Sequence, residues 1–105
     1  MADFVLLYSG GSMPETEEEQ AQALKAWQSW LGDVGDAVKD EGNPFTPAAK
    51  TIAPDGAVSE ANGALATGYS IVKAGSLDEA TTIAKGSPVL QGGGSVTVYE
   101  TFEVM

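Results

Sequence analysis

The side chains best suited to hold a ligand in this sequence are those of Trp27, Trp30, Tyr69, Ser87 and Tyr99. The two tryptophans are three residues apart in a predicted helix, so their indoles share one side of it. Packing against the core is the favoured interpretation of this pair, and an aromatic wall for an apolar or planar ligand is the alternative. A buried indole N–H needs a partner, which a ligand or a water molecule could supply. These residues are therefore the candidates for a small-molecule site.

Three tyrosines, Tyr8, Tyr69 and Tyr99, occur on predicted strands that we expect to be neighbours. Cross-strand packing explains them without a ligand, whereas phenol groups that point into a pocket could bind a ligand oxygen. Ser87 lies between a glycine and a proline, as turn residues do. Its hydroxyl could also lie at the mouth of a pocket between the second helix and the sheet. Since no base accompanies this serine, the sequence argues against acyl transfer and identifies no catalytic residue.

Two other patterns are weaker candidates for a site. Asp33, Asp36 and Asp40 share one side of the first predicted helix, where a solvated acidic face is favoured over a hard cation. A calcium loop needs ligands at alternate positions and a closing glutamate, so we predict no metal site. Residues 10–12 (Gly-Gly-Ser) lie between a strand and a helix, as phosphate loops do. They lack the full glycine signature and a lysine, so we predict no nucleotide or other cofactor.

The composition limits the partners that we expect. The 105 residues, 43% of them hydrophobic, predict one folded domain that spans residues 1–105. Fifteen acidic residues against five basic ones give a net charge of -10, which disfavours nucleic acid and anionic membranes as partners. The chain has no histidine and no cysteine, so the usual neutral-pH base and thiolate chemistry are absent. No basic-then-apolar leader opens it, and a cytoplasmic location is expected.

Hydrophobic periodicity predicts the elements that must position these residues. Residues 3–9 alternate as a strand with apolar side chains on both faces, which is typical of a central strand. A capping box at Thr16 and Glu19 begins a helix, and an apolar stripe continues it to about residue 39. Gly32 and Gly35 lie inside this helix, and close approach of another backbone would explain them. A short edge strand is expected at residues 50–53, and a loop at 54–66, with turns at 55–56 and 62–63.

The last third of the chain has the clearest pattern. A strand is predicted at residues 67–74, and a second capping box at Ser76 and Glu79 begins a helix that ends near Gly86. Three glycines at 92–94 precede a final strand within residues 95–104. The order is β-α-β-β-α-β, which predicts an α+β, ferredoxin-like fold with both helices on one face of a four-stranded antiparallel sheet. The other face stays partly apolar, and we expect a second copy of the chain to cover it in a symmetric homodimer.

Several short segments, taken in order along nearly the whole chain, resemble the YCII-related (YciI-like, DGPF-domain) family. The matching segments are Gly42-Asn43-Pro44, Gly68-Tyr69-Ser70-Ile71-Val72, Ala74-Gly75-Ser76-Leu77-Asp78-Glu79-Ala80, Ala84-Lys85-Gly86-Ser87-Pro88 and Gly93-Gly94-Ser95-Val96. The tryptophan pair of the first helix fits as well. The resemblance implies a ferredoxin-like fold that forms a dimeric α+β barrel.

The family's function is poorly defined, and some members have been suggested to be enzymes with a histidine–aspartate pair. This sequence has no histidine, it has Gly86-Ser87-Pro88 where relatives often carry Gly-Cys-Pro, and Asp55-Gly56-Ala57-Val58 keeps only part of the Asp-Gly-Pro-Phe motif. We therefore rank a dimeric small-molecule-binding domain first and a structural or regulatory protein-interaction module second. A cofactor-free isomerase or lyase comes third; it would need a carboxylate with a raised pKa, with Asp33 or Glu100 as candidates.

Overall fold

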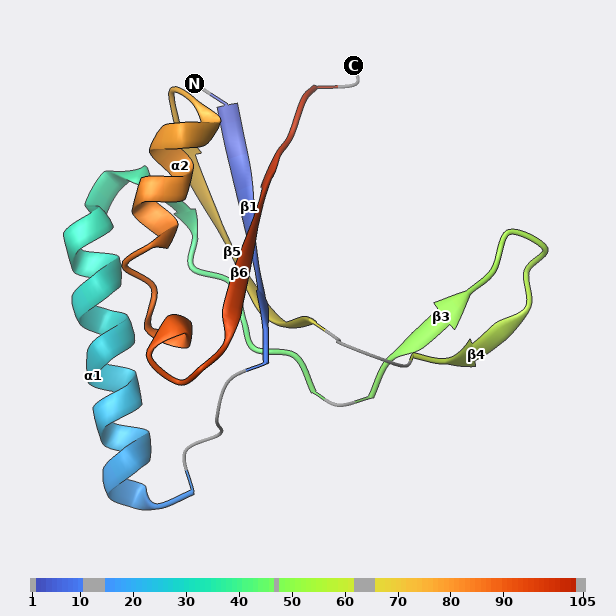
Figure 1. Ribbon diagram of the computed structural model, residues 1–105, viewed down its shortest axis with the longest axis horizontal. Helices are drawn as coiled ribbons and strands as arrows, with labels where there is room; N and C mark the ends of the chain where they lie inside the picture. The colour runs from blue at the N-terminus through green and yellow to red at the C-terminus, as the bar shows by residue number, and fades with distance from the viewer. Residues whose placement is uncertain (1, 11–14, 47, 62–65, 104–105) are drawn as a thin grey trace.

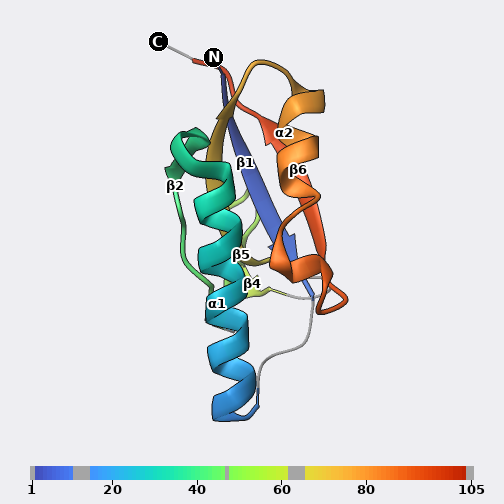
Figure 2. The same cartoon turned by 90° about the vertical axis from the view of Figure 1, so that its left-hand side faces the viewer.

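The computed structural model describes residues 2–10, 15–46, 48–61 and 66–103, which form a layer of helices on one face of a sheet (Figure 1). The sheet is antiparallel and has four strands in the order β2-β5-β1-β6: Val38–Asp40, Ala66–Ala74, Ala2–Ser9 and Ser95–Glu100. The two α-helices, α1 (Glu17–Val34) and α2 (Leu77–Ala84), lie side by side over this sheet (Figure 2). The predicted α+β class with a βαββαβ-like order and a four-stranded antiparallel sheet is confirmed.

The second strand of the sheet is not the predicted one. Helix α1 ends at Val34 and not near residue 39, because Gly35 adopts a positive φ of 64° and donates its N–H to the carbonyl of Leu31. A 3-10 turn, η1 (Gly35–Ala37), then leads directly into β2, which pairs with β5. The apolar side chain at Val38 continued the helical spacing in the sequence, but it packs in the sheet opposite Val72.

The segment predicted as the second strand instead starts a separate hairpin. Strand β3 (Lys50–Ile52) pairs with β4 (Val58–Glu60), inside the segment that was predicted to be a loop. The hairpin extends away from the sheet on the side opposite the helices (Figure 1). Its apolar pair, Ile52 and Val58, remains 70% and 63% exposed. Residues 11–12 of the Gly-Gly-Ser segment, the turn at 62–63 and the end of the final strand at 104 lie outside the described residues.

Both predicted capping boxes form. The hydroxyl of Thr16 accepts the amide of Glu19 at 3.0 Å, and that of Ser76 accepts the amide of Glu79 at 3.1 Å. Each glutamate carboxylate accepts the amide of the residue just before its cap. The predicted backbone approach at Gly32 and Gly35 is wrong, because a Cβ at either position would meet nothing within 4 Å. Gly35 instead allows the chain to turn out of the helix.

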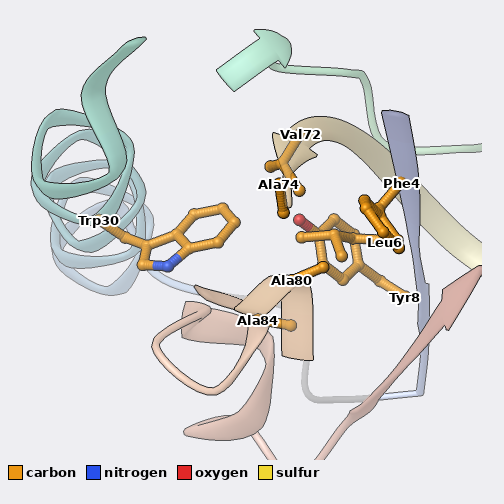
Figure 3. Close-up of a cluster of buried hydrophobic side chains, with 8 residues drawn as sticks. All are labelled: Phe4, Leu6, Tyr8, Trp30, Val72, Ala74, Ala80 and Ala84. Atoms are coloured by element: carbon orange, nitrogen blue, oxygen red, sulfur yellow. The ribbon is translucent and has the colours of Figure 1, made fainter. Parts of the chain in front are cut away.

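The core lies between the helices and the covered face of the sheet (Figure 3). Alternate residues of β1 and β5 point toward the helices, where α1 contributes one large ring and α2 contributes two alanines. The buried cluster is Phe4, Leu6, Tyr8, Trp30, Val72, Ala74, Ala80 and Ala84. The small side chains of α2 allow this helix to lie close to the sheet. No helix in the described ranges is long and apolar enough to cross a membrane.

Candidate functional site

A cavity of about 410 Å³ opens beneath α1, at the end of the sheet where β5 begins. Five segments form its wall: the end of β1, the middle of α1, the loop that follows β2, the start of β5 and the 3-10 turn η2 (Pro88–Leu90). Its lining residues are Tyr8, Leu24, Trp27, Leu31, Glu41, Gly42, Asn43, Pro44, Thr67, Gly68, Tyr69, Ser70 and Val89. This volume is within the range of small-molecule sites in proteins.

One wall of the cavity is aromatic. The ring of Trp27 meets that of Tyr8 edge to face, with centroids 5.2 Å apart and planes at 70°. On its other side it meets Trp30 in the same manner, at 5.6 Å and 79°. Such edge-to-face arrangements are favourable and hold each ring in one orientation. Trp27 therefore presents a supported ring, half-buried, to the cavity.

Two of the lining residues, Tyr8 and Ser70, form a buried pair of hydroxyl groups, which we call the polar floor of the cavity. The Tyr8 Oη lies 2.8 Å from the Ser70 Oγ, which lies 2.7 Å from the backbone carbonyl oxygen of Glu41. Tyr8 is 5% exposed and Ser70 is 1% exposed. Burial raises the pKa of the Tyr8 phenol above its usual value of 10.0, and the hydrogen bond with Ser70 partly opposes this rise. We therefore expect Tyr8 to stay neutral at physiological pH.

The loop that supplies this carbonyl packs directly on β5. Gly42 has a positive φ of 78°, and a Cβ on it would lie 1.6 Å from the carbonyl oxygen of Tyr69. Gly68 leaves similar room, because its Cβ would lie 3.2 Å from the carbonyl oxygen of Asn43. The amide of Phe45 then donates to the carbonyl of Thr67 at 2.8 Å. Two glycines thus allow the backbone contact that places the Glu41 carbonyl on Ser70.

The cavity carries little charge. Among the described residues that line it, Glu41 alone is charged, and it is exposed. In the part of the chain that the structure describes, every carboxylate side chain is exposed except that of Asp3, which is half-buried and pairs with Lys39. Asp33 and Glu100, the candidates for an acid or base, are exposed and lie outside the cavity. In the parts of the chain that the structure describes, no cluster of three acidic side chains is arranged to hold a metal ion.

The structure separates the five residues that the sequence singled out. Trp27 and Tyr69 belong to the cavity lining, although strand alternation puts the Tyr69 ring on the other face of the sheet, where it stacks on Phe45 at 5.8 Å. Trp30 lies behind Trp27 in the core, and its Nε1–H donates to the carbonyl of Ile83 at 3.2 Å. Its indole also lies against Gly86, where a Cβ would come within 3.0 Å of the ring.

Ser87 and Tyr99 do not line the cavity. Ser87 is 1% exposed, so its hydroxyl does not lie at an open mouth, and within the described chain its Oγ has no hydrogen-bond partner. Tyr99 is 51% exposed on β6 and points to the face of the sheet that the helices leave open. The three strands that carry the tyrosines are neighbours as predicted, but only Tyr8 points toward the helices.

Sequence reasoning did not single out Ser70 or the loop glycines. One signal for Ser70 was present: it is the only hydroxyl residue among the inward positions of β5, which otherwise carry glycine, valine and alanine. A polar side chain at such a position needs a buried partner. No local pattern pointed to the Glu41 carbonyl, because this partner comes from another segment, 29 residues away.

Comparisons with known proteins support the fold. No family model matches the chain, and no curated protein matches its sequence. Among solved structures it is similar to 5-chloro-2-hydroxyhydroquinone dehydrochlorinase (TftG) from Burkholderia phenoliruptrix AC1100, in complex with 2,5-dihydroxybenzoquinone. The similarity has a TM-score of 0.53 and covers 94% of this chain and 93% of that chain, at 16% sequence identity. At this identity the comparison establishes a shared fold and does not extend to chemistry.

Proposed function

We propose that this chain is a single YCII-related domain, residues 1–105, that forms a homodimer and binds a small molecule in the cavity beneath α1. The observation that carries the proposal is the cavity itself, which combines a supported aromatic wall at Trp27 with a buried hydroxyl pair at its floor. Apolar walls with a few well-placed polar groups are typical of ligand sites. The YCII-related assignment draws on the segments quoted above and on the shared fold.

The similar structure adds general support for a small ring as ligand. The dehydrochlorinase was solved with 2,5-dihydroxybenzoquinone, so a chain of this fold can hold a planar ring compound. Its enzymatic activity is not carried over. Here the chain has no histidine, and every carboxylate side chain in the described ranges except that of Asp3 is exposed, so no buried acid faces the cavity.

The dimer is proposed from the open face of the sheet. This face, the one without helices, carries Val5, Leu7, Tyr69, Ile71 and Tyr99, which are cross-strand neighbours in the centre of the sheet. All five are half-buried or exposed. A contiguous apolar patch of this kind is typical of a surface that another protein covers. Because this face belongs to a single sheet, a second copy can pack on it about a twofold axis.

A protein-interaction module is the second candidate. The exposed Ile52–Val58 pair of the hairpin favours it, because an isolated two-stranded hairpin is marginally stable in water without a cover. Recovery of a specific partner protein that protects this hairpin from proteolysis, together with failure of all ligands, would favour this function over ligand binding.

Thermal denaturation of the intact chain with a panel of small planar compounds tests the proposed function. A ligand present at a hundred times its dissociation constant should stabilise the folded state by about 2.7 kcal/mol. Trp27→Leu should abolish this stabilisation because it removes the aromatic wall, whereas Phe102→Leu, at a residue 83% exposed outside the cavity, should preserve it. If no compound of the panel shifts the melting temperature, ligand binding in this cavity is excluded for these compounds, and sedimentation at micromolar concentration decides separately on the dimer.

A further inference from the structure

The two hydroxyl groups at the floor of the cavity have no free hydrogen. A backbone carbonyl can only accept, so Ser70 must give its single hydroxyl hydrogen to the Glu41 oxygen at 2.7 Å. Toward Tyr8, at 2.8 Å, the serine oxygen is then left as an acceptor, and the phenol must be the donor. Both hydrogens are used, and each oxygen retains acceptor capacity.

The backbone fixes the donor-to-acceptor direction of these two hydrogen bonds. Gly42 and Gly68 hold the 41–44 loop against β5, so the Glu41 carbonyl cannot turn away without separating two closely packed backbones. If the Tyr8 phenol turned its hydrogen to a ligand, two oxygens would face each other at 2.8 Å without a hydrogen between them. In a buried site that loss is not compensated by water. At these two oxygens, the floor therefore offers a ligand acceptors and no donor.

The charge around the cavity disfavours anionic ligands. Among the described residues, the lining contains no lysine or arginine and only Glu41 is charged, and the whole chain carries a net charge of -10. Burial raises the Tyr8 pKa, so the phenol remains a protonated donor to Ser70 at neutral pH. A carboxylate or phosphate placed on this floor would meet oxygen lone pairs and no compensating cation.

We infer that the ligand is an uncharged planar ring that carries an O–H or N–H group and donates it to the Tyr8 or Ser70 oxygen. This inference rests on the proposed binding function and adds the chemical class and the orientation of the ligand. The ring would lie against Trp27, and its donor would point to the floor between β1 and β5. A ring that offers only acceptors, such as an ether, is disfavoured at the same point.

Two isomers test the inference directly, since 4-ethylphenol has a donor and 4-methylanisole has only an acceptor. Titrations followed by the two indole N–H signals in NMR spectra would give both dissociation constants. We expect 4-ethylphenol to bind about fivefold more tightly, as for one net hydrogen bond. The anion 4-methylbenzoate should bind most weakly. The ether is the more hydrophobic isomer, so simple partition into an apolar cavity would produce the opposite order.

Ser70→Ala sharpens the test because it removes the acceptor that now holds the Tyr8 hydrogen. The phenol can then donate into the cavity, so the preference for 4-ethylphenol should fall to parity or reverse. Tyr99→Phe removes a phenol outside the cavity and should keep the wild-type preference.

Each outcome has one meaning. If wild-type protein binds the ether as tightly as the phenol, or more tightly, the inference is overturned while ligand binding stands. If Ser70→Ala keeps the wild-type preference, the hydrogen-bond chain does not set it, and the inference is again overturned. If no probe binds at millimolar concentration, the proposed function itself fails for planar rings, and the inference fails with it.

Discussion

The two faces of the sheet are built by the same strands but differ in burial. On the covered face, Phe4, Leu6 and Val72 are at most 1% exposed and pack beneath the helices. On the open face, their immediate neighbours Val5 and Ile71 are equally apolar but only half-buried. Strand alternation supplies both faces with hydrophobic side chains, and the helices cover one of them. The comparison shows that a single copy of the chain buries the apolar side chains on one face of its sheet and leaves those on the other face partly exposed.

The difference extends to polar groups. The covered face contains a hydroxyl pair that is hydrogen-bonded to a backbone carbonyl, at Tyr8 and Ser70. On the open face the charges collect at one end, where Asp3 pairs with Lys39. Hydrogen bonds in the buried site are protected from water, whereas an exposed ion pair contributes little. The covered face thus holds the candidate site, and the open face offers the surface of the proposed dimer.

The largest expected effect comes from the same substitution at adjacent residues on opposite faces. Leu6→Ala should destabilise the chain by about 2–5 kcal/mol, because Leu6 is fully buried and a cavity remains. Leu7→Ala should cost roughly 1 kcal/mol or less in the isolated protomer, because Leu7 is only half-buried. Urea denaturation at low protein concentration measures both values.

The dependence of stability on protein concentration tests whether a second copy covers the open face. If a second copy covers the open face, the urea midpoint of the wild type should rise with protein concentration, and Leu7→Ala should reduce that rise. A midpoint that is the same from nanomolar to high micromolar concentration would contradict the proposed dimer.

A second contrast concerns the loop that supports the covered face. Gly42→Ala should destabilise the fold by about 3 kcal/mol, because a left-handed conformation and a contact of 1.6 Å with the Tyr69 carbonyl oxygen act together. Gly35→Ala meets open space, so only the backbone strain at φ 64° and ψ -129° remains, and a smaller loss of about 2 kcal/mol is expected. Thermal denaturation of the two variants compares them. Equal losses would mean that the loop moves away from β5 at little cost.

The smallest expected effect is a difference in pH dependence between two tyrosines. Burial raises the pKa of Tyr8, so the folded chain holds this proton more tightly than the unfolded chain does. Stability from this source is complete below the unfolded pKa near 10 and is lost as the pH rises above it. Tyr8→Phe should lose about 1 kcal/mol at neutral pH and show a weaker decline above pH 10 than the wild type.

Tyr99→Phe provides the matched control, since Tyr99 is half exposed on the open face. This substitution removes the same phenol hydroxyl without changing the covered face. Chemical denaturation at pH 8 and pH 11 gives the comparison, and identical curves for Tyr8→Phe and the wild type would contradict a raised Tyr8 pKa.

Much of the fold was predictable because it depends on neighbours in the sequence. The capping boxes at Thr16 and Ser76 form between residues three apart, and in β1 and β5 the residues that share a face follow from strand alternation. The error at the end of α1 arose because Val34 and Val38 keep helical spacing although they lie in a helix and a strand. Local apolar spacing cannot distinguish these outcomes where a glycine stands between them.

The sequence by itself determined which residues of each strand share a face, where the helices begin, and that the chain would offer apolar surface on both sides of a sheet. Only the tertiary structure decided which short segment became β2 and which tryptophan faces the cavity. It also decided that the Tyr8 hydroxyl meets Ser70 across 62 residues of sequence, and that Ser70 meets the Glu41 carbonyl across 29. Periodicity follows from the geometry of a single helix or strand, whereas these contacts depend on how closely separate segments pack, which two glycines permit.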